Sequence, residues 1–221
     1  MKRVFVIAMP CEAETIYRHF TEHRRLDEFG REIHEGKLHG EETALIVAGV
    51  GKVNAAAATQ LALSKYAPEE IFNAGVCGGC DPKMQVAELY AVDRAFQCDF
   101  DLSAINPTPR GTPNEFDTPW FELRPVAGLP VRRCASGDTF DSEGKDHDFV
   151  CGEMGAYLRE MELGAIAHVC KRAGTQVRAV KAISDVSDPE KESQADQYPK
   201  NLAKALAALA DFFGGDFAET R

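Results

Sequence analysis

The sequence lacks three features that would place it in a common class: a long apolar run, a low-complexity linker and an excess of basic residues. No stretch approaches the roughly 20 apolar residues that span a bilayer, so we expect no membrane association. The apolar run at residues 3–9 is better explained as a buried first strand than as a signal peptide, since it is short and has no small-residue cleavage site. Without a linker, residues 1–221 are expected to form a single domain.

Basic residues are few, with 25 Lys and Arg against 35 Asp and Glu, and the formal net charge is −10. Phosphate backbones and anionic lipids are generally bound by clustered Lys and Arg, so we expect no nucleic-acid partner. The seven cysteines are an odd number. Cys98, Cys134 and Cys170 have apolar surroundings, which indicates reduced, buried thiols, no structural disulfide and a cytoplasmic location.

Apolar runs alternate with helical patterns along the chain. Strands are predicted at 3–9, 43–48, 71–73, 86–92, 131–135 and 177–183, and helices at 11–20, 53–65, 163–173 and 201–213. The segment that holds His34 and His39 alternates like a β-hairpin. The proline-rich segment 106–119 is expected to be an irregular loop. This order predicts an α/β fold, a three-layer sandwich with a largely parallel or mixed central sheet flanked by helices. Ligands gather at the carboxyl ends of strands in such sheets, so polar groups that follow the strands are expected to converge there.

Asp185 stands near the end of an apolar strand in the string KAISDVSD, residues 181–188. A half-buried carboxyl group can have a raised pKa and act as a general acid. A second interpretation is that Ser184 or Asp185 caps the turn that follows. The string alone does not separate the two interpretations.

Two carboxylates, Glu160 and Glu162, precede the predicted helix 163–173. Negative charge is favourable at a helix N-terminus, so capping is a complete structural explanation. The alternative is a ribose site, because carboxylates are common acceptors for paired sugar hydroxyls.

The glycine-rich string NAGVCGGC at residues 73–80 is predicted to be a turn that lets backbone approach a flat ligand or an anion. It has neither the G-x-G-x-x-G spacing nor the Walker Lys-Ser/Thr pair, which excludes a dinucleotide fingerprint or P-loop here. Cys77 and Cys80 form a C-x-x-C, but no second ligand pair follows at zinc-like spacing. We therefore favour a ligand turn over a metal or redox site.

Six strings in this order resemble the 5′-methylthioadenosine/S-adenosylhomocysteine nucleosidases of the nucleoside phosphorylase/hydrolase superfamily. They are Ala8-Met9 with Glu12, Gly49–Val53, the glycine turn ending at Gly78-Gly79, Ser136–Phe140, Glu160–Glu162 and Ala182–Val186. The resemblance implies hydrolysis of the N-glycosidic bond of methylthioadenosine, adenosylhomocysteine or 5′-deoxyadenosine, with release of adenine and no metal or organic cofactor. It also implies that the sandwich has a central twisted mixed β-sheet flanked by helices. The same resemblance implies a homodimer in which partner residues near Ala104 to Pro107 close the 5′ side of the pocket.

The same resemblance assigns roles to individual residues. Asp185 would protonate N7 of the purine, Glu12 would position the attacking water, and Glu162 would hold the ribose hydroxyls. Departure of the base builds oxocarbenium character on the ribose, which a nearby carboxylate stabilises. The other residues expected to bind substrate are Met9, Val76, Gly78, Phe140, Asp141, Glu160, Met161, Lys181 and Ser184.

Three residues depart from the family pattern: Val76 replaces the usual Ser, Lys181 the usual Arg, and Asp141 an apolar residue beside the base. A point charge in place of a forked guanidinium can alter water placement. An alternative substrate is therefore another purine nucleoside, such as futalosine or inosine.

Two further alternatives are a purine nucleoside phosphorylase and a non-catalytic purine-binding protein. A carboxylate at Glu12 repels phosphate, which argues against the first. The presence of Glu12, Glu162 and Asp185 together argues against the second.

Overall fold

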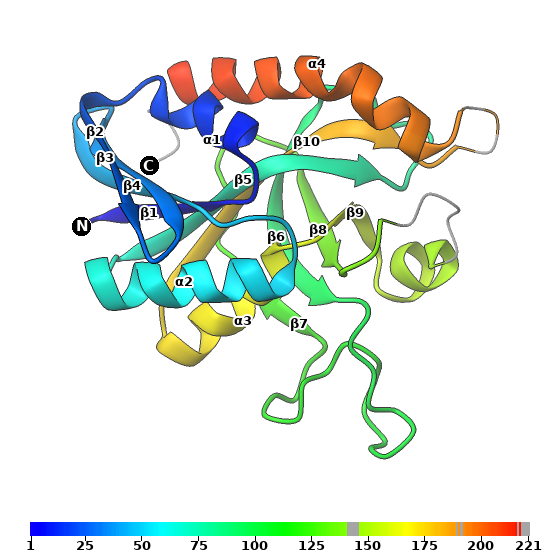
Figure 1. Ribbon diagram of the computed structural model, residues 1–221. Helices are drawn as coiled ribbons and strands as arrows, with labels where there is room; N and C mark the ends of the chain where they lie inside the picture. The colour runs from blue at the N-terminus through cyan, green and yellow to red at the C-terminus, as the bar shows by residue number, and fades with distance from the viewer. Residues whose placement is uncertain (141–145, 189, 191, 216, 218–221) are drawn as a thin grey trace.

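The computed structural model describes residues 1–140, 146–188, 190, 192–215 and 217. One mixed β-sheet lies between two layers of helices, with α1 and α4 above it and α2 and α3 below it in the view of Figure 1. The predicted three-layer α/β arrangement is therefore confirmed. None of the described helices is long and apolar enough to cross a membrane.

Within the described residues the sheet contains ten strands. They are β1 (Arg3–Ile7), β2 (Thr21–Glu28), β3 (Arg31–Leu38), β4 (Glu41–Val47), β5 (Glu70–Gly79), β6 (Leu89–Gln97), β7 (Trp120–Glu122), β8 (Val131–Ser136), β9 (Ala156–Glu160) and β10 (Gln176–Val186). The helices are α1 (Pro10–Tyr17), α2 (Lys52–Tyr66), the π-helix η1 (Asp148–Glu153), α3 (Leu163–Ala173) and α4 (Gln194–Gly214).

The central strands are buried along most of their length because helices cover both of their faces. All five residues of β1 are buried, and this strand pairs in parallel with β4 on one side and β5 on the other. β10 also pairs in parallel with β5, and its other neighbour is the antiparallel β6. The pairs β6–β8, β8–β9 and β9–β5 complete a ring of five strands, so this half of the sheet closes on itself.

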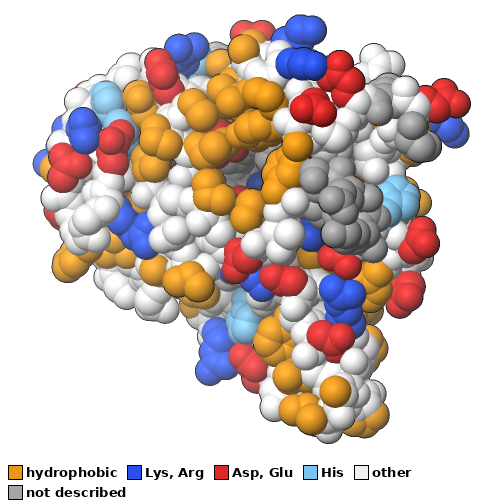
Figure 2. Space-filling model, turned by 45° about the vertical axis from the view of Figure 1, so that its right-hand side comes forward, with side chains coloured by type: hydrophobic (Ala, Val, Ile, Leu, Met, Phe, Trp, Pro, Cys, Tyr) orange, Lys and Arg blue, Asp and Glu red, His pale blue; other side chains and the backbone are white. Residues whose placement is uncertain are grey.

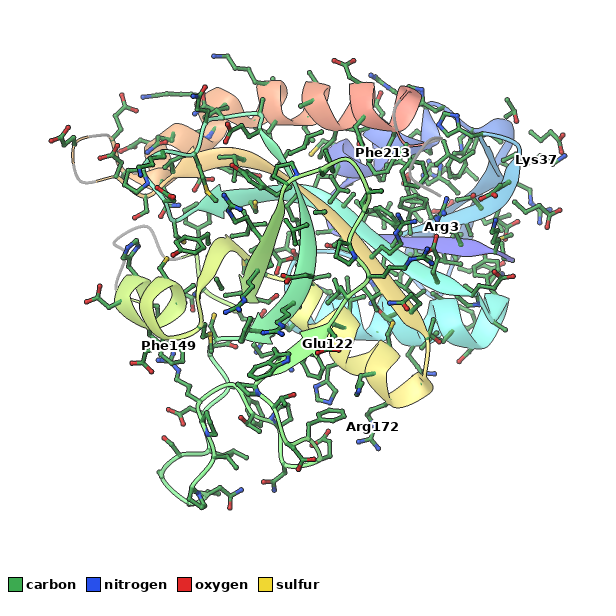
Figure 3. The ribbon with its side chains drawn as sticks, turned by 180° about the vertical axis from the view of Figure 1, so that it is seen from behind. Arg3, Lys37, Glu122, Phe149, Arg172 and Phe213 are labelled. Atoms are coloured by element: carbon green, nitrogen blue, oxygen red, sulfur yellow. The ribbon has the colours of Figure 1, made fainter. Side chains whose placement is uncertain are left out.

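Helix α4 covers the upper face with its aromatic side chains. Phe213 is fully buried, and its ring centroid lies 5.7 Å from that of Phe5 on β1 in an edge-to-face arrangement. Figure 3 shows Phe213 on the inner side of α4 and Arg3 close by on the sheet. This packing fixes the end of the last helix against the first strand.

Several elements differ from those predicted. Residues 75–79 belong to β5 rather than to a turn, because their backbone pairs with β10. Helix α4 begins at Gln194, seven residues before the predicted start at residue 201. The strands β2, β7 and β9 and the helix η1 were not predicted. The segment 106–119 is irregular, as expected, and projects from the body of the fold in Figure 1.

Candidate active site

A cavity of about 400 Å³ opens at the carboxyl ends of β1, β5 and β10, a volume in the usual range for small-molecule sites. Figure 2 shows a hollow ringed by hydrophobic side chains on this face. Its lining residues are Ala8, Met9, Glu12, Val50, Val76, Cys77, Gly78, Thr139, Phe140, Arg159, Glu160, Met161, Glu162, Ser184, Asp185, Gln194, Ala195 and Tyr198. Carboxylates thus lie inside a largely apolar pocket.

Glu12 is held rigidly at the start of α1. Its Oε2 accepts a hydrogen bond of 3.0 Å from the backbone N–H of Met9, and its Oε1 accepts one of 2.8 Å from Val76 N–H in β5. The side chain is only 4% exposed, and burial raises the pKa of this carboxyl group above its ordinary value. The first interaction is half of a capping box, so a helix cap positions this carboxylate.

Glu160 serves the structure beneath the pocket. Its carboxylate accepts hydrogen bonds from the backbone N–H groups of Glu162 and Leu163, and so caps α3. It also accepts from the Ser136 hydroxyl and pairs with Lys181, whose Nζ lies 2.8 Å from Oε2. Burial acts against ionisation of Glu160, but attraction to Lys181 prevails and lowers its pKa. The capping interpretation of the sequence therefore describes this residue.

Glu162 faces the cavity as the N-cap residue of α3. Its Oε1 accepts a hydrogen bond of 2.8 Å from Gly51 N–H, at the turn between β4 and α2. Burial, and then repulsion from Glu160, raise the pKa of Glu162 to about 7. This carboxyl group is therefore close to half ionised at neutral pH and responds readily to a nearby charge.

Asp185 is 2% exposed and lies after an irregularity in the pairing of β10 with β5. Such bulges re-aim a side chain, and here the carboxyl group lines the pocket. The Ser184 hydroxyl donates to Oδ2 at 2.7 Å, and the Gln194 side-chain amide donates to Oδ1 at 2.7 Å. Burial outweighs these two hydrogen bonds and raises the pKa of Asp185. An oriented carboxyl group with a raised pKa can donate a proton to a ligand.

Two glycines of β5 make room for these carboxyl groups. A Cβ atom on Gly75 would lie 2.5 Å from Oε1 of Glu12, and one on Gly78 would lie 2.9 Å from Oδ1 of Asp185. Both glycines are therefore required by close approach of side chains, and not by a turn as the sequence suggested.

Aromatic and sulfur groups line the mouth of the cavity. Phe140 is 49% exposed, and its ring centroid lies 6.0 Å from that of Tyr198 in an edge-to-face arrangement. The Tyr198 hydroxyl donates to Sδ of Met9 at 3.6 Å. Flat rings beside a thioether are suited to contact a purine or an apolar substituent.

Most of the residues expected to bind substrate line this cavity. They are Met9, Glu12, Val76, Gly78, Phe140, Glu160, Met161, Glu162, Ser184 and Asp185. Lys181 does not line the cavity but lies behind it, paired with Glu160, so its expected contact with the water site is replaced by an indirect influence on the carboxylates. Asp141 lies outside the described residues.

The sequence interpretation missed Gln194 and Tyr198, the two α4 residues that contact Asp185 and Met9. Pro199, which discourages a helix, masked the start of α4. A signal was present: Ser193 accepts a hydrogen bond from Asp196 N–H as the helix cap, a Ser-x-x-Asp pattern.

The chain belongs to the phosphorylase superfamily, whose family model matches residues 2–214. The 5′-methylthioadenosine/S-adenosylhomocysteine nucleosidase of Geobacillus thermodenitrificans is 31% identical over 223 residues, which covers 95% of this chain and 94% of that protein. The protein of the same name from a Marinomonas species is 29% identical and covers 89% of this chain and 91% of its own length.

Solved structures share the fold. A Helicobacter pylori methylthioadenosine nucleosidase mutant with 5′-methylthioadenosine in its active site superposes with a TM-score of 0.87 at 22% identity, over 99% of this chain and 98% of that one. The futalosine hydrolase of the same species gives the same TM-score and identity, over 99% and 97% of the two chains. The fold therefore agrees with nucleosidases of more than one substrate.

Proposed function

We propose that this protein hydrolyses the N-glycosidic bond of an adenine nucleoside with an apolar or thioether 5′ substituent: methylthioadenosine, adenosylhomocysteine or 5′-deoxyadenosine. The observation that carries the proposal is the placement of Glu12, Glu162 and Asp185 around one apolar cavity, with burial raising the pKa of all three carboxyl groups. The named relatives that align over nearly the whole chain support this substrate class.

The reaction follows from the position of each group. Asp185 gives its proton to N7 of the purine, the bond between C1′ and N9 breaks, and its electron pair leaves with the base. Water adds to C1′ while Glu12 accepts the water's proton, so the net change is addition of water across the broken bond. Glu12 returns this proton to solvent and Asp185 regains one, which restores the starting state. Glu162 accepts hydrogen bonds from the ribose hydroxyls.

The charge balance of the pocket favours hydrolysis over phosphorolysis. A ribosyl oxocarbenium ion is positive, so the carboxylates of Glu12 and Glu162 stabilise it, and its charge in turn favours their ionised forms. Among the described lining residues the only cation is Arg159, which donates to Cys98 Sγ and lies 3.7 Å from Asp146. A phosphate dianion would meet carboxylates without a cation directed towards it.

A second candidate substrate is a 6-oxopurine nucleoside such as futalosine, favoured by the equal structural match to a futalosine hydrolase. Both substrates require the same acid and the same water. The two substrates differ in the group at position 6 of the purine. Both have an N7 atom that Asp185 can protonate.

Release of free base from methylthioadenosine, adenosylhomocysteine, 5′-deoxyadenosine, inosine and futalosine, measured by chromatography in phosphate-free buffer, tests the proposal. We expect adenine without added phosphate. Release from the 6-oxopurine nucleosides alone would establish the second candidate, and release that requires phosphate would identify a phosphorylase. Binding of adenine without turnover of any nucleoside would make this a binding protein.

Two substitutions test the roles of the carboxyl groups. Asp185→Asn should abolish turnover and keep measurable nucleoside binding, and Glu12→Gln should lose activity without loss of the folded state. Glu14→Gln is the matched control, since Glu14 is on the same helix and its side chain is 54% exposed. Full activity in either carboxyl variant would remove that residue from the mechanism.

We also propose that the chain acts as one domain in a cytoplasmic homodimer, with the segment Ala104 to Pro107 of the partner closing the mouth of the cavity. Exposed apolar side chains support this proposal. Ile105 is 78% exposed on the projecting segment, and Val53 is 80% exposed at the start of α2, near Val50 of the cavity lining. Exposed apolar groups of this kind mark interaction sites, and their burial in an interface removes apolar surface from water.

A further inference from the structure

A second group of chemically reactive side chains lies outside the proposed active site. Cys80 follows the last residue of β5, while His147 and Cys151 come from the start and the body of η1, the helix that Phe149 marks in Figure 3. The ligand atoms of these three residues all lie within 4.8 Å of one another. They converge although 71 residues separate Cys80 from Cys151 in the sequence.

The spacing of these atoms matches a tetrahedral metal centre. The Sγ atom of Cys151 lies 3.7 Å from Nδ1 of His147. Two ligands at ordinary zinc–sulfur and zinc–nitrogen bond lengths are about 3.6 Å apart in a tetrahedron. The remaining separations, up to 4.8 Å, close with about 1 Å of side-chain movement, which a small rotation about a Cys side-chain bond provides.

The surroundings suit a cation that has three protein ligands and a fourth coordination position open to solvent. A surface groove is lined by the three residues together with Asp81 and Asp148, whose carboxylates supply negative charge at its rim and a candidate fourth ligand. The His147–Cys151 spacing of four residues places both side chains on one face of the helix. The helix is a π-helix, a rare form that is frequent at functional sites.

We propose that Cys80, His147 and Cys151 form a binding site for a zinc-class divalent cation, with a water molecule or a neighbouring carboxylate as fourth ligand. Two sulfur ligands and one imidazole select a borderline-soft ion over Mg²⁺ or Ca²⁺, which prefer oxygen. On binding, each thiol gives its proton to solvent and the metal accepts the thiolate electron pair. The site differs from the C-x-x-C of the sequence, because Cys77 lines the nucleoside cavity instead.

A metal at this position would join η1 to the end of β5, the strand that lines the proposed active site. Cys80 follows Gly78 by two residues, and Gly78 lies against Asp185. On the other side, His147 precedes the helix whose Val150 packs with Phe96 and Met154. The metal would therefore act as a structural clamp between β5 and η1 and take no part in the reaction.

Metal binding is tested with the full-length protein, reduced with a phosphine and freed of metal by a chelator. We expect one equivalent of Zn²⁺ by calorimetry, and with Co²⁺ the thiolate charge-transfer and tetrahedral ligand-field absorption bands. Zn²⁺ should also raise the unfolding temperature, because it binds the folded state preferentially.

Cys80→Ser, Cys151→Ser and His147→Asn should each weaken Zn²⁺ binding by about 100-fold or more, since loss of even an outer-shell partner costs 10- to 100-fold. Cys11→Ser, at a half-buried thiol on α1, is the matched control and should bind Zn²⁺ as the parent does. Absence of stoichiometric Zn²⁺ uptake, or equal affinity in the three variants, would overturn the proposal. Octahedral Co²⁺ spectra without thiolate bands would overturn it as well.

Discussion

Replacing Lys181 by Met is the perturbation with the clearest expected cost. The ammonium group lies 2.8 Å from Glu160, and the side chains of both residues are at most 3% exposed. Removing one partner leaves an uncompensated buried charge, so we expect the free energy of unfolding to fall by about 3 to 5 kcal/mol. Adding Glu160→Gln removes that charge. The double variant should regain at least half of the lost free energy of unfolding, even though it has fewer interactions than the Lys181→Met variant.

The loss should depend on pH in a defined way. Burial opposes the charge of Lys181, but attraction to Glu160 prevails and raises its pKa above the ordinary 10.5, while the pKa of Glu160 lies below the ordinary 4.5. The pair therefore contributes its full stability between pH 4.5 and 10.5. This contribution is lost as pH falls through the folded-state pKa of Glu160, or rises through that of Lys181.

Urea unfolding followed by circular dichroism at pH 7 and at pH 4 measures these effects. The difference between parent and Lys181→Met should be smaller at pH 4. A loss below about 1 kcal/mol at pH 7, the size typical of an exposed ion pair, would refute the argument. So would a double variant whose loss equals the sum of the two single losses, because residues in contact should couple.

Three further outcomes follow from the geometry. Gln194→Leu removes a hydrogen bond that favours ionised Asp185, so the pKa of Asp185 should rise. The alkaline limb of the kcat/KM profile should then move to higher pH. A limb that does not move would show that Gln194 does not influence the acid. Gly75→Ala places a Cβ 2.5 Å from the Glu12 carboxylate, so kcat should fall by about tenfold or more while the protein stays folded, and an unchanged kcat would show that this carboxylate tolerates displacement. Ile105→Asp should shift sedimentation from dimer to monomer and raise KM, and a dimer of unchanged affinity would place the interface elsewhere.

The sequence predicted the elements that are buried in the structure, because burial requires a high proportion of apolar residues that can be recognised in the sequence. β1 and β10 are rich in apolar residues and are buried along almost their whole length, because helices cover both faces of the sheet. β2 was not predicted because most of its residues are exposed and charged, so neither an apolar run nor an alternation marks it. β9 has five residues and depends on pairing with β8, which is distant in sequence.

The same distinction applies to the candidate site: local patterns mark some of its residues, whereas tertiary packing alone creates the contacts between them. Glu12 and Asp185 stand beside strand ends that composition reveals, and Glu162 precedes a helix that its apolar pattern reveals, so all three could be chosen as candidates from the sequence. The partners that tune them were not, since Lys181 reaches Glu160 and Gln194 reaches Asp185 only through tertiary packing. The proximity of Cys80 and Cys151 likewise depends on the position of η1 beside the end of β5. Local patterns carry no information on such approaches.

The candidate cavity is built from residues near both ends of the described chain, with Glu12 in the first helix and Tyr198 in the last. During synthesis, the ribosome therefore releases most of the sheet before any complete binding site exists. A ligand of this cavity would not stabilise the growing polypeptide, because it would bind only the complete fold. Long-range pairing of this kind slows folding, so the emerging chain depends on the intrinsic stability of its early strands until α4 docks.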